Sequence, residues 1–151
     1  MPIPEPRSCL TVDEIRVGDC AEKTYRIEAE DAVRFSELSG DWNPAHHDAD
    51  YAAKSVFKER IAHGIYSVAQ FSDLFGMRLP GLGAIWLKES VEFLAPAYFG
   101  REYRAVVTVT EVDVAANTVT FLTECFDADD KCILTGESVV KPIPGHLRDK
   151  R

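Results

Sequence analysis

The sequence predicts an α+β domain in which a curved antiparallel sheet wraps around a long central helix. Residues 61–77 place apolar side chains around most of a helical circumference, which is typical of a helix buried in a core. Four strand-like runs follow this segment, and the connections between them carry the turn-forming residues expected of antiparallel neighbours. A sheet that curls around the helix buries the apolar surface of both elements.

Composition and charge limit the class of protein. The 151 residues are 46% hydrophobic and 28% charged, which predicts one globular domain over 1–151, with a core at about 18–141, an N-terminal arm and a C-terminal tail. The net charge of −8 argues against a nucleic-acid partner, and no apolar run is long enough to span a membrane. The four cysteines lack CxxC spacing and no signal peptide precedes them, which indicates reduced thiols in a cytoplasmic protein.

The first half of the chain is expected to deliver a loop to the central helix. Residues 21–27 alternate weakly and suit an edge strand. Residues 28–39 predict a helix with Ala32, Phe35 and Leu38 on its apolar face, acidic residues in its first turn and Gly40 at its end. This helix leads directly to Asp41, and a short helix is expected to start at Asp48 or Asp50.

The second half of the chain is predicted to form β-strands. We expect the first at about 85–93, with Ile85, Leu87, Val91 and Phe93 on one face and Glu89 as an unexplained exception. Three further strands are expected at 104–112, 118–126 and 132–141, ending before Pro142.

The stretch SGDWNPAHHDADY contains a candidate acid/base pair. Asn43 precedes a proline and is therefore expected to be extended, so that the loop forms a defined bend. Such a bend can bring Asp41 and His46 to one water molecule, which one group deprotonates while the other donates. The alternative is structural: Asp41 caps a turn and His46 is a surface histidine.

Residues at the start of the central helix add a possible ligand site. Gly64 has no side chain and sits where helix N–H groups lack partners, so a carbonyl docked there would be polarised. For His63 we favour a structural role, in which it satisfies polar groups at the helix end, over a catalytic one. Ser67, Gln70 and Asp73 form a narrow polar strip on this helix. Ser72 falls outside that strip, so its hydroxyl is expected to be buried against either a main-chain carbonyl or the loop.

Histidine and carboxylate are ordinary metal ligands, so Asp41, His46, His47 and His63 could together hold an ion. Their spacing matches no zinc signature. We therefore expect no metal.

The motif Asp41-Trp42-Asn43-Pro44-Ala45-His46, followed by His63-Gly64 at a helix start, resembles the MaoC-like dehydratase family. It is most similar to the single-domain (R)-specific enoyl-CoA hydratases of that family, and the likeness covers about 18–141. The loop motif is fairly specific, whereas a His-Gly pair alone would be a weak signal.

The resemblance implies a hot-dog fold, a homodimer or dimer of dimers, and a hydro-lyase reaction in fatty acid metabolism. Water would add syn to a trans-2-enoyl-CoA without a metal or redox cofactor. Asp41 and His46 would be the catalytic dyad, the Gly64 N–H would polarise the thioester, and Asn43, His63 and Ser72 would support them.

An acyl-CoA substrate needs cations for its phosphates, and the candidates are Lys54, Lys58 and Arg60, for which solvated surface charge is the competing interpretation. Three alternative functions stay open at this point: a hot-dog acyl-CoA thioesterase, a dehydratase acting on acyl carrier protein, and a non-catalytic acyl-CoA-binding subunit.

Overall fold

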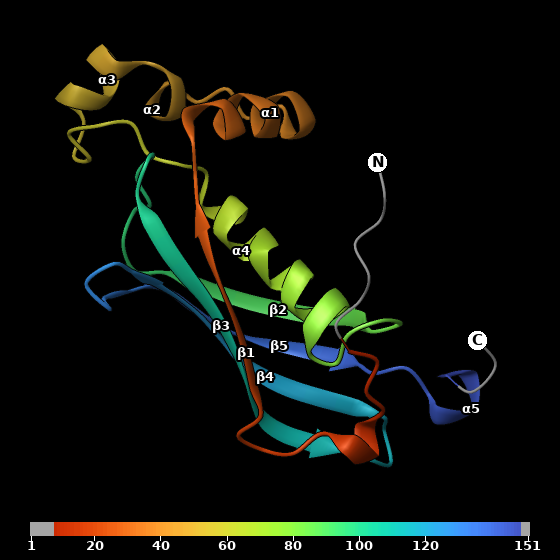
Figure 1. The fold of residues 1–151 in the computed structure, drawn as a ribbon. Coiled ribbons are helices and arrows are strands. Elements are labelled where there is room, and N and C mark those ends of the chain that lie inside the picture. Colours follow the sequence, from red (N-terminus) through yellow and green to blue (C-terminus); the bar gives the residue numbers. More distant parts are fainter. Residues whose placement is uncertain (1–7, 149–151) are drawn as a thin grey trace.

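A computed structural model describes residues 8–148. One sheet contains five antiparallel strands in the order β1-β3-β4-β5-β2, and helix α4 lies across one face of it (Figure 1). The strands are β1 (Cys20–Arg26), β2 (Ile85–Phe93), β3 (Glu102–Asp113), β4 (Thr118–Asp127) and β5 (Cys132–Lys141). The predicted α+β class is confirmed, as are the edge position of the first strand and the bounds of the last three strands to within two residues.

The helices fall into two groups at opposite ends of the sheet. Helices α1 (Ala29–Ser39), α2 (Pro44–His47) and α3 (Ala49–Lys54) lie beyond the first turn of α4 (Gly64–Asp73), and α5 (Gly145–Arg148) lies at the other end (Figure 1). A 3₁₀ turn, η1 (Val12–Glu14), precedes β1. Of the expected N-terminal arm at residues 1–9, only residues 8 and 9 are among those described. Within 8–148, none of the helices combines the length and the apolar character that crossing a membrane requires.

Helix α1 begins and ends where its sequence predicts, but its buried face differs from the prediction. Gly40 adopts the left-handed conformation (φ 80°) that closes the helix. Ala32 and Ser36, one turn apart, face inward, whereas Leu38 is 86% exposed and the prediction for it was wrong. The helix therefore presents a hydroxyl, not a leucine, toward the loop that follows it.

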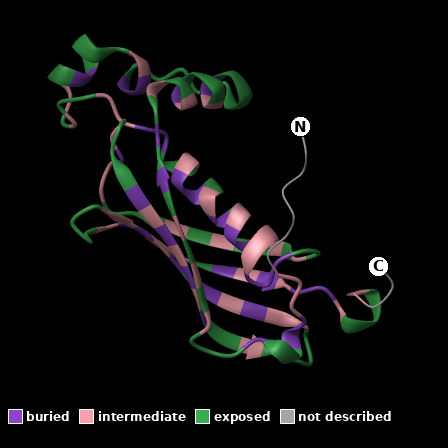
Figure 2. Cartoon of the chain, in the orientation of Figure 1, coloured by how far each residue is buried: buried purple, intermediate pink, exposed green. Residues whose placement is uncertain are grey.

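Helix α4 is buried on one side only. Its side chains Val68 and Phe71 pack against the sheet, and the chain continues into a π-helical turn, η2 (Leu74–Arg78), that adds Leu74 and Phe75 to the core. Ile65 is 52% exposed, so the prediction of burial on all sides was wrong for this helix. Figure 2 shows the same division, with buried segments on the strands and α4 and mostly exposed surface on α1 and α3.

Strand β2 contains a bulge that explains the exception noted at Glu89. Its pairing with β5 shifts register between Trp86 and Lys88, so Leu87 is the extra residue and the face of the strand changes there. Glu89 thus shares the inner face with Val91 and Phe93, and the predicted grouping with Ile85 and Leu87 was wrong. The Glu89 carboxylate accepts hydrogen bonds from the hydroxyls of Ser138 and Thr123.

All four cysteines are free, as predicted: Cys9, Cys20, Cys125 and Cys132.

Candidate active site

The loop between α1 and α2 is a defined bend, as its sequence predicts. Asn43 is extended (φ −55°, ψ 129°) before Pro44, which opens α2. The Asn43 side chain caps that helix by accepting a hydrogen bond from the Ala45 N–H at 3.0 Å. The predicted supporting role of Asn43 is therefore local: it fixes the turn that separates Asp41 from His46.

Asp41 and His46 approach one another across this bend. Asp41 Oδ1 accepts a hydrogen bond from the Asn43 N–H at 3.1 Å, which leaves Oδ2 to face His46 Nε2 at 3.7 Å. His46 Nδ1 lies 2.8 Å from the carbonyl oxygen of Ile61. Because a carbonyl only accepts, Nδ1 carries a proton, and in the neutral tautomer with that proton Nε2 presents a lone pair. The gap of 3.7 Å exceeds a direct hydrogen bond and suits a shared water molecule.

His63 lies behind the pair. Its ring stacks on the His46 ring with 3.8 Å between centroids, and its Nε2 lies 3.1 Å from the main-chain oxygen of Asp41. Burial lowers the pKa of His63 below its ordinary value, so the neutral ring is favoured. Its side chain contacts the loop backbone and the imidazole of His46, which is the arrangement of a support for the dyad.

The same three side chains lie close enough together to be considered as metal ligands. Ligand atoms of Asp41, His46 and His63 lie within 4.8 Å of one another. His63 Nε2, however, contacts the Asp41 carbonyl oxygen, and that contact requires a proton on the same nitrogen. A metal ligand needs a free lone pair there. In this tautomer the cluster offers only two free ligand atoms, which favours hydrogen bonding over metal coordination.

Gly64 is the first residue of α4, so its N–H has no acceptor within the helix and lies at the positive end of the helix dipole. A Cβ at this position would lie 2.6 Å from Cε1 of Phe93, so the bare backbone also makes room for that ring. His63 precedes the helix as its N-cap residue without a side-chain cap bond. The predicted helix start is thus confirmed.

A cavity of about 430 Å³ opens beside these residues. His46 and Gly64 border it together with the buried hydroxyl of Ser67, and its walls are otherwise apolar. The remaining lining residues are Phe57, Ile61, Ala62, Ile65, Phe93, Leu94, Ala95, Pro96, Ala97, Ile133 and Leu134. An apolar cavity with a few polar groups at one end is the usual form of a site for a small molecule with a hydrocarbon part.

The serine that faces inward from α4 is not the one expected. Ser72 is exposed, so the prediction that its hydroxyl is buried was wrong. Ser67 is buried instead, and its Oγ accepts a hydrogen bond from the Tyr25 hydroxyl at 2.9 Å. The error has a simple cause: the sheet covers the side of α4 that carries Ser67, and helical periodicity alone does not say which side that is.

Ser36 was not among the predicted site residues, and His47 was considered only as a possible metal ligand. Both contact one another beside the dyad, with Ser36 Oγ 2.8 Å from His47 Nε2. The sequence offered one signal for Ser36: it follows Ala32 by one helical turn and therefore shares its face of α1. Phe93, which covers Gly64, was placed on the correct face of its strand but not in the site.

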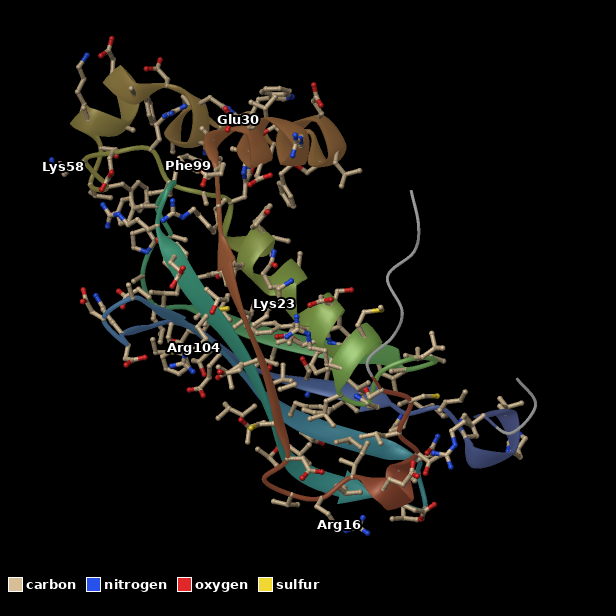
Figure 3. All side chains as sticks on the ribbon, in the orientation of Figure 1. Arg16, Lys23, Glu30, Lys58, Phe99 and Arg104 are labelled. Atoms are coloured by element: carbon tan, nitrogen blue, oxygen red, sulfur yellow. The ribbon has the colours of Figure 1, made fainter. Side chains whose placement is uncertain are left out.

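The three candidate cations lie in or next to the segment between α3 and α4. Lys58 and Arg60 lie between Phe57 and Ile61, which border the cavity. The Arg60 guanidinium lies 5.5 Å from the centre of the Phe99 ring. Figure 3 shows Lys58 and Phe99 at the same end of the molecule. Lys54 borders a separate exposed hollow together with Asp48 and Asp50.

The chain is similar to several known proteins along most of its length. A model of the MaoC-like domain matches residues 17–125. An (R)-specific enoyl-CoA hydratase from Rhodospirillum rubrum is 42% identical over 128 residues, covering 85% of this chain and 88% of the relative. The solved (R)-hydratase of Aeromonas caviae superimposes with a TM-score of 0.83 at 36% identity, covering 85% of this chain and 98% of that one. An R-hydratase from Pseudomonas aeruginosa gives a TM-score of 0.81 at 37% identity, covering 87% of this chain and 84% of that one.

The domain match spans more than half of the chain, and the sheet with its central helix is the hot-dog fold of these hydratases. The chain therefore belongs to the MaoC-like domain family.

Proposed function

We infer that this protein is an (R)-specific enoyl-CoA hydratase, a hydro-lyase that adds water reversibly to a trans-2-enoyl thioester. The observation that carries the proposal is the pair of acceptors Asp41 Oδ2 and His46 Nε2, which lie 3.7 Å apart, with His46 bordering an apolar cavity. Relatives that share the family and most of the chain length carry this activity in their names.

Two acceptors define how the water is held. A water molecule that donates one hydrogen to Asp41 Oδ2 and the other to His46 Nε2 directs an oxygen lone pair into the cavity. As this oxygen forms its bond to C3 of the enoyl group, one of the two acceptors takes the water proton. The same dyad then delivers that proton to C2, so the proton count closes with both groups restored.

The thioester develops negative charge on its carbonyl oxygen as the new bond at C3 forms. The Gly64 N–H, at the first turn of α4, is placed to stabilise that oxygen more strongly in the transition state than in the substrate. Since one dyad handles both the hydroxyl and the proton, both add to the same face of the double bond. Hydration involves no net oxidation or reduction, so the proposal needs no redox cofactor.

The phosphates of coenzyme A require cations near the cavity mouth. Among the three candidates, Lys58 and Arg60 suit this role better because they lie between two residues that border the cavity, Phe57 and Ile61. Lys54 shares its hollow with two carboxylates, which would repel a phosphate. We therefore assign the CoA contact to Lys58 and Arg60.

We also propose that two copies associate through β2. This strand is at the edge of the sheet, so one side of its backbone has no partner strand among residues 8–148. Exposed apolar side chains lie along it and on the adjacent face of α4: Ile65, Ile85, Leu87, Phe93 and Leu94. A second copy of the chain would cover them.

The test is an assay of purified protein with trans-2-enoyl-CoA substrates of increasing chain length. Loss of the enoyl absorbance with formation of the (R)-3-hydroxyacyl-CoA supports the proposal. Release of free CoA thiol without hydration would identify a thioesterase instead, and binding without turnover would identify a non-catalytic subunit. A strong preference for enoyl groups on acyl carrier protein would move the assignment to the corresponding dehydratase.

A further inference from the structure

The main chain of Asp41 is held by a side-chain network that lies outside the dyad. Ser36, fully buried on α1, places its Oγ 2.6 Å from the Asp41 carbonyl oxygen, 2.8 Å from His47 Nε2 and 3.3 Å from His63 Nε2. The hydroxyl on α1 thus contacts three other segments of the chain: the loop after α1, helix α2 and the residue before α4.

The direction of each hydrogen bond follows from the number of protons. A carbonyl oxygen only accepts, so Ser36 gives its single proton to the Asp41 oxygen across the shortest contact, 2.6 Å. The Ser36 oxygen is then an acceptor toward His47, whose Nε2 must carry a proton. His63 Nε2 donates to the same Asp41 carbonyl at 3.1 Å. The chain of donors therefore runs from His47 through Ser36 to Asp41, with His63 as the second donor.

This network matters because the two halves of the dyad are anchored to different parts of the fold. His46 is fixed by its bond to the Ile61 carbonyl, before α4. The Asp41 side chain is 51% exposed; it accepts a local hydrogen bond from the Asn43 N–H, and its Oδ2 lies 3.8 Å from His63 Nε2, too far for a hydrogen bond. Its position relative to His46 is therefore set through its backbone, and Ser36 and His63 hold that backbone.

We propose that Ser36 and His47 form a positioning pair that fixes Asp41 at the distance from His46 at which both can share one water. The pair acts through the Asp41 main chain and does not touch substrate. This inference rests on the proposed hydratase function, but the hydrogen-bond arrangement itself can be tested without any turnover.

The kinetic test compares Ser36→Ala, His47→Leu and the double variant. Each single change is expected to lower kcat by about 10- to 100-fold, the scale of a misplaced reacting group, while KM changes less than about twofold. Leucine at 47 still packs on Trp42, whose ring lies 5.1 Å from the His47 ring, but cannot donate. His47→Gln keeps a donor N–H and is expected to recover most of the loss.

The double variant is expected to be no slower than the worse single variant, because both changes break the same chain of bonds. Thr110→Val is the matched control: it removes a hydroxyl that donates to the Thr120 carbonyl at 3.2 Å on β3, and kcat should be unchanged. Fully additive losses, or a wild-type kcat in Ser36→Ala, would overturn the pair as a positioning device while leaving the hydratase assignment in place.

The structural test is nitrogen-15 NMR of the histidine rings in the wild-type protein. A proton on His47 Nε2 that exchanges slowly, and that exchanges fast in Ser36→Ala, is expected. A His47 ring protonated only at Nδ1 would overturn the proposal, whether or not the protein hydrates enoyl-CoA.

Discussion

The Oδ2 atom of Asp41 lies 3.7 Å from Nε2 of His46, and in each side chain the other polar atom makes a hydrogen bond elsewhere. Asn43 occupies Oδ1 of the carboxylate, and the Ile61 carbonyl occupies Nδ1 of the ring. Two acceptors without a hydrogen between them repel one another unless a donor comes between them. Water is the donor that the reaction consumes.

Gly64→Ala tests the close approach at the start of α4. An added Cβ would lie 2.6 Å from Cε1 of Phe93, so the ring must move, and it borders the cavity. The N–H of residue 64 persists in this variant, so we expect the main effect on KM, which should rise by about tenfold or more. The fall in kcat should be smaller. Steady-state kinetics over several chain lengths measure both constants.

The control for that experiment is the double variant Gly64→Ala with Phe93→Ala, compared with Phe93→Ala alone. If crowding by the ring is the cause, adding the methyl group at 64 should have little effect once the ring is gone. An equal loss in both backgrounds would show that the substrate itself needs the bare glycine.

We expect the buried His63 ring to make the folded protein less stable at acid pH. Burial lowers its folded-state pKa below the ordinary value of about 6.5, so as pH falls the unfolded chain binds this proton first. The contribution of the neutral ring is complete above about pH 6.5 and is lost as pH falls through the lowered folded pKa. Denaturant unfolding measured between about pH 5 and pH 8, a range that brackets this ordinary value, tests the expectation. The free energy of unfolding should fall more steeply toward acid pH in the wild type than in His63→Gln. Parallel curves for the two proteins would contradict this.

We expect Glu89 to have the opposite effect, lowering the stability of the folded protein as pH rises. Its inner-face position raises the pKa of the carboxyl through burial, although the hydroxyls of Ser138 and Thr123 donate to it. As pH rises through the ordinary glutamate value of about 4.3 and then through the raised folded pKa, the unfolded chain releases its proton first and the wild type loses stability. Glu89→Gln is therefore expected to gain stability relative to the wild type between about pH 4 and pH 7. A stability difference that is constant with pH would show that Glu89 is fully solvated.

The parts of the site that were predictable from sequence are those coded by short local patterns. Asn43-Pro44 determines its own bend and cap within a few residues, so the approach of Asp41 and His46 could be expected. The start of α4 at Gly64 and the end of α1 at Gly40 are also local signals.

The parts that were missed depend on how elements pack. Ser36 and His47 are eleven residues apart and meet only because α1 docks beside α2. Ser67 and Ser72 lie on different sides of α4, and only the side that the sheet covers is buried. Helical periodicity does not say which side that is. The bulge at Leu87 is a one-residue shift in pairing, which reverses the faces of β2 without leaving a mark in its composition.

The most direct test of the account is the turnover of Asp41→Asn with a trans-2-enoyl-CoA substrate. Asp41 is half exposed, so this change should leave the unfolding free energy close to that of the wild type. Removing one of the two acceptors should lower kcat by about 100-fold or more, the usual scale of a lost acid/base group. A folded Asp41→Asn protein that forms (R)-3-hydroxyacyl-CoA at nearly the wild-type rate would contradict the assignment of the dyad.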